Sequence, residues 1–426
     1  MAAEPTRGGW DVAVIGGGIV GLAAARALAR RGAAVVLLER DQPGRGATWA
    51  AGGMLSPLPE AGDPAFLTLA TASLDLFPAF VAGLEAESGR AVDYRRSGKL
   101  HVAFGSGDSG HLEALVTSPH AAAFGVRPVA AAAARRMEPA LSPALTGAVL
   151  VERDHHVDPR ALGSAAAAAA AVAGVEMRAA ASVQGVAVRQ GRVRGVRLAD
   201  GKLLAADAVV VAAGSWSGAL RGLPRPLPVF PVRGEMVALR GPGPLLERVV
   251  STPRCYLIPR SDGRLLVGAT EAEVGYAPGP TAAGVAALLE AALAALPACA
   301  ALPVAETWCG YRPGTPDHLP FLGEDPEARG LIYATGHYRN GILLAPVSAD
   351  VVAALLAGEP PPVALAAFRP ERFVADATVA DRVDFTPDYD PDAPVPCERC
   401  GGTMEYTASC KLVCRTCGYM RDCSDP

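Results

Sequence analysis

The chain has 426 residues, half of them hydrophobic, and a formal net charge of −4. This length suffices for more than one domain and a substantial core, while the near-neutral charge argues against a nucleic-acid-binding field over the whole surface. Because the N-terminus carries no signal-peptide pattern and no run is long and apolar enough to span a bilayer, we expect a cytoplasmic protein with neither a membrane nor a nucleic acid as partner.

The first predicted elements form a βαβ unit at the N-terminus. An apolar strand over residues 12–15 leads into a GxGxxG motif at 16–21 and a helix over 22–30, and a second strand over 34–38 ends at Glu39. In this context the glycines permit a tight turn and a close approach to a pyrophosphate, and the acid can accept both ribose hydroxyls. The unit predicts a site for FAD or NAD, because a carboxylate at this position disfavours the 2′-phosphate of NADP.

A second glycine-rich segment, residues 45–55, follows the acid closely. Small residues there let the backbone approach a bulky flat ring, and Trp49, Met54 and Leu55 argue against a flexible surface loop. This segment, together with the position of the motif at the N-terminus, favours FAD over NAD.

The predicted strands show two kinds of sequence pattern. Three apolar strands end in glycine, at residues 12–16, 209–214 and 331–336. Continuous apolar strands are typical of a parallel sheet buried on both faces, and ligands bind beyond the carboxyl ends of such strands, so these three predict one cleft. Residues 90–150 and 225–325 instead carry short alternating runs, which predict antiparallel strands with one solvent-exposed face.

These elements together predict an α/β fold in which a Rossmann-like FAD-binding domain of the glutathione-reductase type is interleaved with an antiparallel substrate domain. A linker rich in charge and proline precedes a small C-terminal zinc-ribbon-like module. The expected boundaries are 8–88, 150–225 and 326–368 for the FAD-binding domain, 89–149 and 226–325 for the substrate domain, 369–392 for the linker and 393–426 for the module.

Arg339 lies between Gly336 and Gly341, after an apolar strand and before an apolar helix start. A guanidinium is always charged and binds carboxylates with two parallel hydrogen bonds, and a helix N-terminus also attracts negative charge. The loop therefore predicts an anion site. Arg312, in an Arg-Pro-Gly sequence, fits turn chemistry equally well, and Tyr256 taken alone fits core packing.

Six of the nine cysteines lie in the last thirty residues. Cys397 and Cys400 form one CxxC unit, and Cys414 and Cys417 form another after thirteen residues. This spacing is typical of a tetrahedral thiolate site, for which we expect zinc. A rubredoxin-type iron site and a redox dithiol remain open, and Cys410 or Cys423 could replace one of the four ligands.

The chain resembles the D-amino-acid-oxidase-like flavoenzymes and, within them, the glycine oxidases of thiamine biosynthesis. The resemblance covers residues 8–370, and glycine oxidases usually lack the cysteine module. The segments that carry it are 15–21, 47–55, 213–218, 255–260, 310–315 and 336–346.

The resemblance implies noncovalent FAD, because the late loop lacks the cysteine to which covalent members of the family attach their flavin. The same loop is expected along the isoalloxazine ring. The expected FAD contacts are Gly16, Gly18, Ile19, Val20, Gly21, Glu39, Arg40, Ala47, Thr48, Gly52, Gly53, Met54, Val183, Gly214, His337, Tyr338, Arg339, Asn340, Gly341, Ile342 and Leu343.

The resemblance further implies that Arg312 and Arg339 hold the carboxylate of a small amino acid and that Tyr256 adds a hydroxyl. Moving a hydride from Cα to flavin N5 is the work of the cofactor, so we expect no catalytic acid or base and a protein that orients the substrate. Reoxidation by O2 would give hydrogen peroxide. The imine would be hydrolysed or passed to thiazole synthesis, with a thiazole-synthesis protein as a possible partner of a homo-oligomer.

The substrate stays open at this stage. Glu271 stands where related enzymes often have an apolar residue, and it could narrow the pocket or bind the substrate amine. The alternatives are a D-amino-acid or sarcosine-type oxidase or dehydrogenase of the same family, an NAD-dependent dehydrogenase, and a binding protein whose flavin fold is vestigial.

Overall fold

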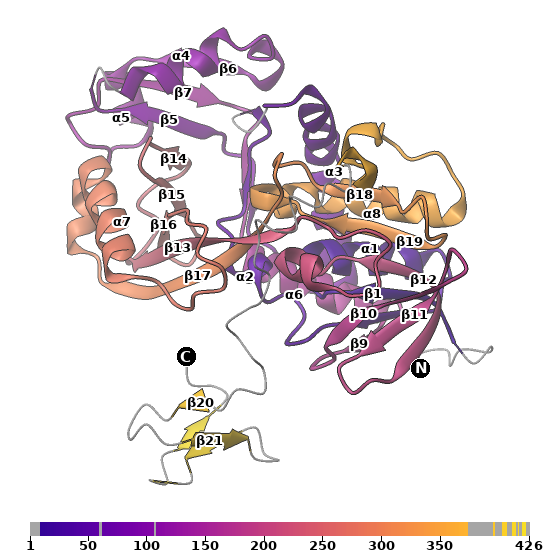
Figure 1. Cartoon of the computed structure of the whole chain (residues 1–426). Coiled ribbons are helices and arrows are strands. Elements are labelled where there is room, and N and C mark those ends of the chain that lie inside the picture. The colour runs from indigo at the N-terminus through magenta and orange to yellow at the C-terminus, as the bar shows by residue number, and fades with distance from the viewer. Residues whose placement is uncertain are drawn as a thin grey trace. The chain divides into compact units, whose positions relative to one another are not determined.

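The computed structural model of the chain describes residues 9–58, 62–105, 108–373 and the strands of a small sheet between residues 395 and 422 (Figure 1). Met1–Val383 forms one compact unit and Asp384–Pro426 a second. The predicted α/β fold class is confirmed by the first unit, while the boundaries between the FAD-binding and substrate segments stay a prediction.

The central sheet of the first unit is parallel at its core. Strands β2 and β19 are buried throughout, and β1 and β12 are buried over their last four residues, as expected for strands covered on both faces. The order of the parallel strands is β19 (Leu331–Thr335), β12 (Leu203–Val211), β1 (Trp10–Ile15), β2 (Val35–Leu38) and β9 (Glu176–Arg178). Antiparallel strands extend this sheet, namely β10 (Val183–Arg189) and β11 (Arg192–Leu198) from β12, and β18 (Phe321–Glu324) from β19.

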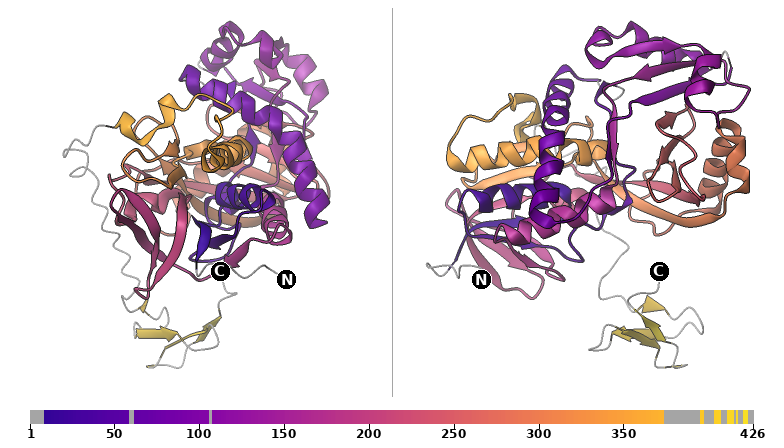
Figure 2. Two further views of the ribbon diagram at one scale, coloured as in Figure 1. Left: turned by 90° about the vertical axis from the view of Figure 1, so that its right-hand side faces the viewer. Right: turned by 180° about the vertical axis from the view of Figure 1, so that it is seen from behind.

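Three helices, α1 with α6 and α8 on either side of it, cover one face of this sheet, and a fourth, α3, crosses over them and packs on α6 and α8 (Figures 1 and 2). Their ends follow from the sequence: an aspartate caps the first turns of α3 and α6 and a proline follows each cap, while a left-handed glycine ends α3 and α8. The helices are α1 (Ile19–Arg30), α3 (Pro64–Ser88), α6 (Pro159–Val172) and α8 (Gly341–Ala357). Helix α1 begins three residues earlier than predicted, so the last glycine of the motif lies inside it.

Helix α3 and the helical run Tyr338–Ala357, which contains α8, are long and apolar enough, by length and composition, to span a membrane, contrary to the expectation from the sequence. However, α8 is mostly buried against α1 and α3. Both helices contribute to the main hydrophobic core. Their apolar character is therefore explained by packing in this core.

The second sheet is mixed, with antiparallel pairing throughout except at one junction. The strand order is β17 (Val304–Gly314), β13 (Phe230–Arg240), β16 (Arg264–Gly268), β15 (Tyr256–Pro259), β14 (Val249–Ser251), β5 (Lys99–Ala103), β7 (Gly147–Val151) and β6 (Val126–Val129). The predicted antiparallel pairing holds throughout this sheet except between β14 and β5, which run parallel. These two strands come from distant chain segments, so no short connection dictates their direction.

The two faces of the second sheet have different partners. One face packs against α5 (Ala131–Met137) and α7 (Ala282–Ala295) in an apolar cluster. The other face carries a smaller apolar cluster around Met236, Ile258 and Trp308 and then lines a cavity. The predicted solvent-exposed face is therefore the wall of a ligand site.

The remaining elements are short. The flavin-loop segment predicted at 45–55 forms α2 (Ala47–Ala50) and β3 (Met54–Leu55), and β3 pairs with β8 (His155–Val157), which pairs with β4 (Tyr94–Arg95). The others are α4 (Ser109–Thr117) and 3-10 helices at Ala122–Phe124, Gly214–Ala219, Pro297–Ala301, Tyr338–Asn340, Ala366–Phe368 and Pro370–Arg372.

The C-terminal unit contains an antiparallel sheet in the order β20 (Val395–Pro396), β21 (Thr403–Tyr406), β22 (Lys411–Cys414) and β23 (Met420–Asp422). The expected ligands Cys397, Cys400 and Cys417 lie outside the described residues. Cys414 ends β22, and no metal-binding cluster of three or more candidate ligands occurs among the residues that are described. The zinc module stays a prediction.

Candidate active site

A cavity of about 990 Å³ lies between the carboxyl ends of the parallel strands and the second sheet. It is as large as the largest common ligand pockets, which span about 300–1,000 Å³. The three glycine-ended strands β1, β12 and β19 are neighbours and all reach it, as predicted. All predicted FAD and substrate residues line the cavity except Gly21 and Leu343, which are buried behind it.

The N-terminal turn is built for a close approach of backbone. Gly16 has a φ of +104°, and a Cβ there would lie 2.4 Å from the carbonyl oxygen of Ala212. A Cβ on Gly21 would lie 2.0 Å from the carbonyl oxygen of Gly16. Only glycine fits these two positions, and the resulting turn leaves the N-terminus of α1 at the cavity, where a pyrophosphate can bind.

Polar groups from two other segments meet this turn. The backbone N–H of Ile19 donates to Oγ1 of Thr48 (2.9 Å), and the N–H of Gly17 donates to Oε2 of Glu39 (2.7 Å). Glu39 therefore lies at the glycine turn, as a ribose ligand must, and Thr48 links the flavin loop to the helix N-terminus. These residues fit the dinucleotide part of FAD.

The flavin loop is held by a buried arginine that the sequence did not single out. Arg260, 1% exposed, donates from Nη2 to the carbonyl oxygen of Gly52 (2.6 Å), and its Nη1 lies 3.4 Å from Nδ1 of His156. Burial lowers the pKa of Arg260 to about 10, which the charge of Asp158 opposes, so the guanidinium stays charged at neutral pH. In the sequence, Arg260 directly follows the apolar run 256–259. A charged residue in such a position can be buried if it is paired, and this pattern could have indicated its role.

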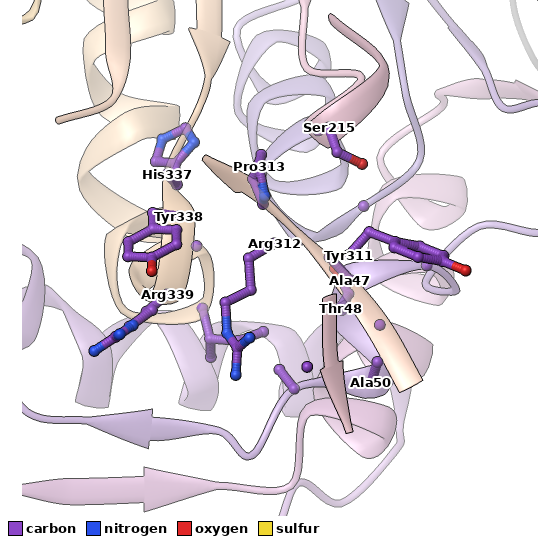
Figure 3. A pocket seen from close by; sticks show the side chains of 18 of the residues that line it. Ala47, Thr48, Ala50, Ser215, Tyr311, Arg312, Pro313, His337, Tyr338 and Arg339 are labelled. Carbon is purple, nitrogen blue, oxygen red and sulfur yellow. The ribbon is translucent and has the colours of Figure 1, made fainter. Parts of the chain in front are cut away.

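Arg312 extends from β17 into the cavity (Figure 3). Its Nη1 and Nη2 both donate to the carbonyl oxygen of Thr270 at 3.2 Å. A Cβ on Gly234, in the neighbouring strand, would lie 2.3 Å from Nη1. Glycine at 234 therefore lets the guanidinium lie flat over β13, and this places a cation at the cavity wall.

Arg339 has an internal carboxylate partner. It forms an ion pair with Glu271, and the hydroxyl of Tyr338 donates to the same carboxylate. Burial alone would raise the pKa of Glu271, but the hydrogen bond from Tyr338 and the charges of Arg339 and Arg312 outweigh it and lower this pKa. Glu271 thus lines the cavity as an anion, and it pairs with the guanidinium of Arg339, which was expected to bind the substrate carboxylate.

Two further predicted residues have defined surroundings. His337 is buried, and its Nε2 lies 3.0 Å from Oγ of Ser348. Burial lowers the pKa of His337 to about 4, so the ring is neutral at pH 7, and its contact with Ser348 holds it against α8. The hydroxyl of Tyr256 donates to Sδ of Met236 (3.4 Å) on the cavity-lining face of the second sheet.

An aromatic stack closes the cavity on the side of β12. The guanidinium carbon of Arg40 lies 3.4 Å from the ring centre of Trp216, which stacks on Tyr276 with 5.0 Å between ring centres. The hydroxyl of Tyr311 donates to the carbonyl oxygens of Tyr276 (3.1 Å) and Ala277 (3.0 Å). The stack and Glu271 together fix the loop 269–280 over the cavity, and the sequence patterns did not reveal this loop.

A glycine turn at a helix N-terminus, a carboxylate beside it and a large cavity lined by arginines define a flavin-dependent oxidoreductase. Residues 11–355 match the family described as FAD dependent oxidoreductase, and the chain belongs to this family. Its cofactor is FAD, and the alternatives of an NAD-dependent dehydrogenase and of a vestigial flavin fold are not supported.

Within this family, the chain is similar to glycine oxidases and to bifunctional ThiO/ThiG proteins. The chain is 37% identical to the glycine oxidase of Pseudomonas putida over 85% of this chain and 98% of that protein. It is 38% identical to the bifunctional protein ThiO/ThiG of Synechocystis over 85% of this chain, but it spans only about half of that protein (54%). The crystal structure of glycine oxidase from Geobacillus kaustophilus superposes with a TM-score of 0.82 at 35% identity, covering 86% of this chain and 99% of the other.

Proposed function

We propose that the protein oxidises glycine, or a similarly small primary or secondary amino acid, by removal of a hydride from Cα. The observation that carries this proposal is the single cavity shared by the dinucleotide turn, the flavin loop and Arg312 with Tyr256. The similarity to glycine oxidases over nearly their full length supports the same reaction.

The glycine turn, Glu39 and the flavin loop would hold FAD, which would supply the hydride acceptor and, with O2 as the oxidant reduced to hydrogen peroxide, the route by which the electrons leave. The protein holds the substrate carboxylate through the N–H groups of Arg312 that do not point at the Thr270 carbonyl and through the Tyr256 hydroxyl, so that Cα is oriented for transfer. Because a hydride leaves Cα with its electron pair, no side chain needs to remove a proton from carbon. His337, beside this site, is neutral and bonded to Ser348.

We further propose that the imine product supplies thiazole formation in thiamine biosynthesis. The bifunctional relative named ThiO/ThiG joins a region similar to this chain to a second region in one polypeptide. That arrangement favours a thiazole-synthesis protein as the partner. A D-amino-acid or sarcosine-type oxidase is the alternative.

The remaining proposals concern the whole chain. We propose that it works in the cytoplasm as a homo-oligomer and that the C-terminal module binds zinc through Cys397, Cys400, Cys414 and Cys417. The paired CxxC units support zinc, since a module this short needs a metal to stabilise its fold.

A visible spectrum recorded without oxygen tests the reaction. Addition of glycine should bleach the flavin bands, and readmission of oxygen should restore them with release of peroxide. A panel of glycine, sarcosine and bulky D-amino acids, scored by peroxide release, separates the candidates. Activity on bulky D-amino acids without activity on glycine would refute the assignment.

A further inference from the structure

The loop 269–280, which lies over the cavity, is joined to strand β13 by a short run of backbone hydrogen bonds. The N–H of Thr270 donates to the carbonyl oxygen of Glu235 (3.3 Å). Two residues further along the loop, Ala272 and Arg233 exchange two hydrogen bonds of 3.0 and 2.8 Å. The start of the loop therefore lies in a fixed register beside β13.

The side chain of Glu235 fixes the same register. Its own backbone N–H donates to Oγ1 of Thr270 (2.9 Å), and this hydroxyl donates in turn to Oε2 of Glu235 (2.9 Å). Oε1 of Glu235 accepts from the backbone N–H of Thr281 (2.7 Å), the residue that caps α7 directly after the loop. One carboxylate therefore anchors the chain on both sides of the loop.

The Glu235 carboxylate is buried and charged. The residue is 2% exposed, and a Cβ on Gly284 would lie 1.7 Å from Oε2, so the first turn of α7 fits closely around the carboxylate. Burial alone would raise the pKa of Glu235, but the hydrogen bonds from the Thr281 N–H and the Thr270 hydroxyl outweigh it and lower this pKa. A buried anion needs its donors, so removal of the Thr270 hydroxyl should displace the start of the loop.

Thr270 connects this anchor to the arginine that binds the substrate carboxylate. Its carbonyl oxygen accepts from both Nη1 and Nη2 of Arg312, each at 3.2 Å. Among the described residues, those that line the cavity include Arg312 but neither Glu235 nor Thr270. A displaced Thr270 carbonyl would therefore move the guanidinium from behind the cavity wall.

We propose that Glu235 is a positioning residue that sets the place of Arg312 through Thr270. This inference rests on the proposed function, because the carboxylate that Arg312 binds is that of the amino-acid substrate. The Thr270 hydroxyl fixes the Thr270 carbonyl, and the carbonyl fixes the guanidinium. Because Arg312 binds the carboxylate before and during hydride transfer alike, loss of this placement should raise KM more than it lowers kcat.

Steady-state kinetics of the FAD-loaded protein with glycine test this role. Thr270→Val removes the hydroxyl and keeps the branched shape, so KM should rise about tenfold while kcat stays within about threefold. Thr270→Ser keeps the hydroxyl, and its KM should stay within about twofold of the wild-type value. An unchanged KM in Thr270→Val, or an equal rise in Thr270→Ser, overturns the proposal.

Thr146→Val is the matched control. The hydroxyl of Thr146 donates to the carbonyl oxygen of Ala103 (3.0 Å) near the other end of the same sheet, and Thr146 does not line the cavity. This variant loses a comparable hydrogen bond and should keep the wild-type KM. A rise in KM equal to that of Thr270→Val would attribute the effect to a general loss of stability and overturn the proposal.

Glu235→Gln provides the same comparison if Thr270→Val does not retain FAD. The glutamine amide has one acceptor oxygen where the carboxylate has two. Either Thr270 or Thr281 therefore loses its acceptor, and KM for glycine should rise about three- to tenfold. A wild-type KM in Glu235→Gln overturns the proposal as well.

A double-mutant cycle tests whether Thr270 acts through Arg312. In an Arg312→Met background the Thr270 carbonyl has no guanidinium to place, so Thr270→Val should lower kcat/KM for glycine by less than about twofold further. This constant is obtained from the initial slope, without saturation. A further loss of about tenfold in this background would show that Thr270 acts without Arg312, which overturns the proposal.

Binding of glycolate, which has a carboxylate but no amine, separates this proposal from the proposed function. Its binding is followed by the perturbation of the flavin spectrum. About tenfold weaker binding in Thr270→Val than in the wild type supports the positioning role even if no amine is oxidised. Glycine oxidation with equal KM and equal glycolate binding in both proteins leaves the proposed function intact and refutes the role of Glu235.

Discussion

Replacing Glu271 with glutamine should improve the binding of glycine. In the structure Glu271 holds the guanidinium of Arg339 and the hydroxyl of Tyr338. A substrate carboxylate must therefore compete with an internal one for Arg339. The variant Glu271→Gln keeps the size of the side chain but removes the negative charge, so that Glu271 no longer competes with the substrate carboxylate for Arg339.

The expected change in KM follows from the solvent exposure of the Arg339–Glu271 ion pair. The side chains of Arg339 and Glu271 are 42% and 41% exposed, so breaking the pair costs only about 0–1 kcal/mol. A hydrogen bond from a guanidinium to a carboxylate contributes about 1.5–3 kcal/mol. The net gain of about 1–2 kcal/mol predicts that KM for glycine falls by roughly 5- to 30-fold. We expect kcat to stay within about threefold, because the hydride transfer itself is unchanged.

The assay is peroxide release at a series of glycine concentrations, together with the glycine dependence of flavin reduction without oxygen. Glu273→Gln is the matched control, because Glu273 lies in the same loop but does not line the cavity. A higher KM in Glu271→Gln would show that Glu271 binds the substrate amine, and an unchanged KM would show that Arg339 does not contact the substrate. Either result refutes the competition.

Four other outcomes follow from the geometry. Arg312→Lys loses the planar fork, and kcat/KM for glycine should fall about 10- to 100-fold while flavin content stays constant. Arg260→Met leaves the Gly52 carbonyl without its donor, so FAD affinity, measured by the fluorescence of released flavin, should weaken about tenfold; unchanged affinity would remove Arg260 from this role. Asp154 has a raised pKa, so the folded protein should lose up to about 3 kcal/mol of stability as the pH rises from about 4 to about 6, and thermal unfolding of Asp154→Asn should lack this loss. Deletion of residues 384–426 should preserve flavin content and turnover within about twofold, and loss of both in a folded truncated protein would contradict this.

The nucleotide part of the site could be predicted from the sequence because it depends on local rules. At Gly16 and Gly21 any Cβ would collide with backbone atoms, so only glycine fits there. The buried ends of strands β1 and β12 are continuous apolar runs, which a sequence also shows directly. Such constraints lie within short segments of chain. Parallel strands then bring their glycine ends to the same edge, which is why the shared cleft of β1, β12 and β19 could also be expected.

The parts that could not be predicted depend on contacts between distant segments. The pairing of Glu271 with Arg339 depends on how the loop 269–280 folds over the cavity, and the Trp216–Tyr276 stack that fixes this loop joins two separate segments. The burial of Arg260 depends on the carbonyl of Gly52, about two hundred residues earlier in the chain. Neither Glu271 nor Arg260 has a sequence pattern that predicts its partner, because a single charged residue is most often exposed to solvent.

The charge of Glu271 bears on substrate choice. Near Arg312, Glu271 forms an ion pair with Arg339, so a substrate carboxylate meets Arg312, whose guanidinium donates to the carbonyl oxygen of Thr270. A second carboxylate on the substrate close to Arg339 would be repelled by Glu271, because like charges at short distance disfavour each other. Glu271 therefore discriminates against such a substrate, and in Glu271→Gln this discrimination should fall.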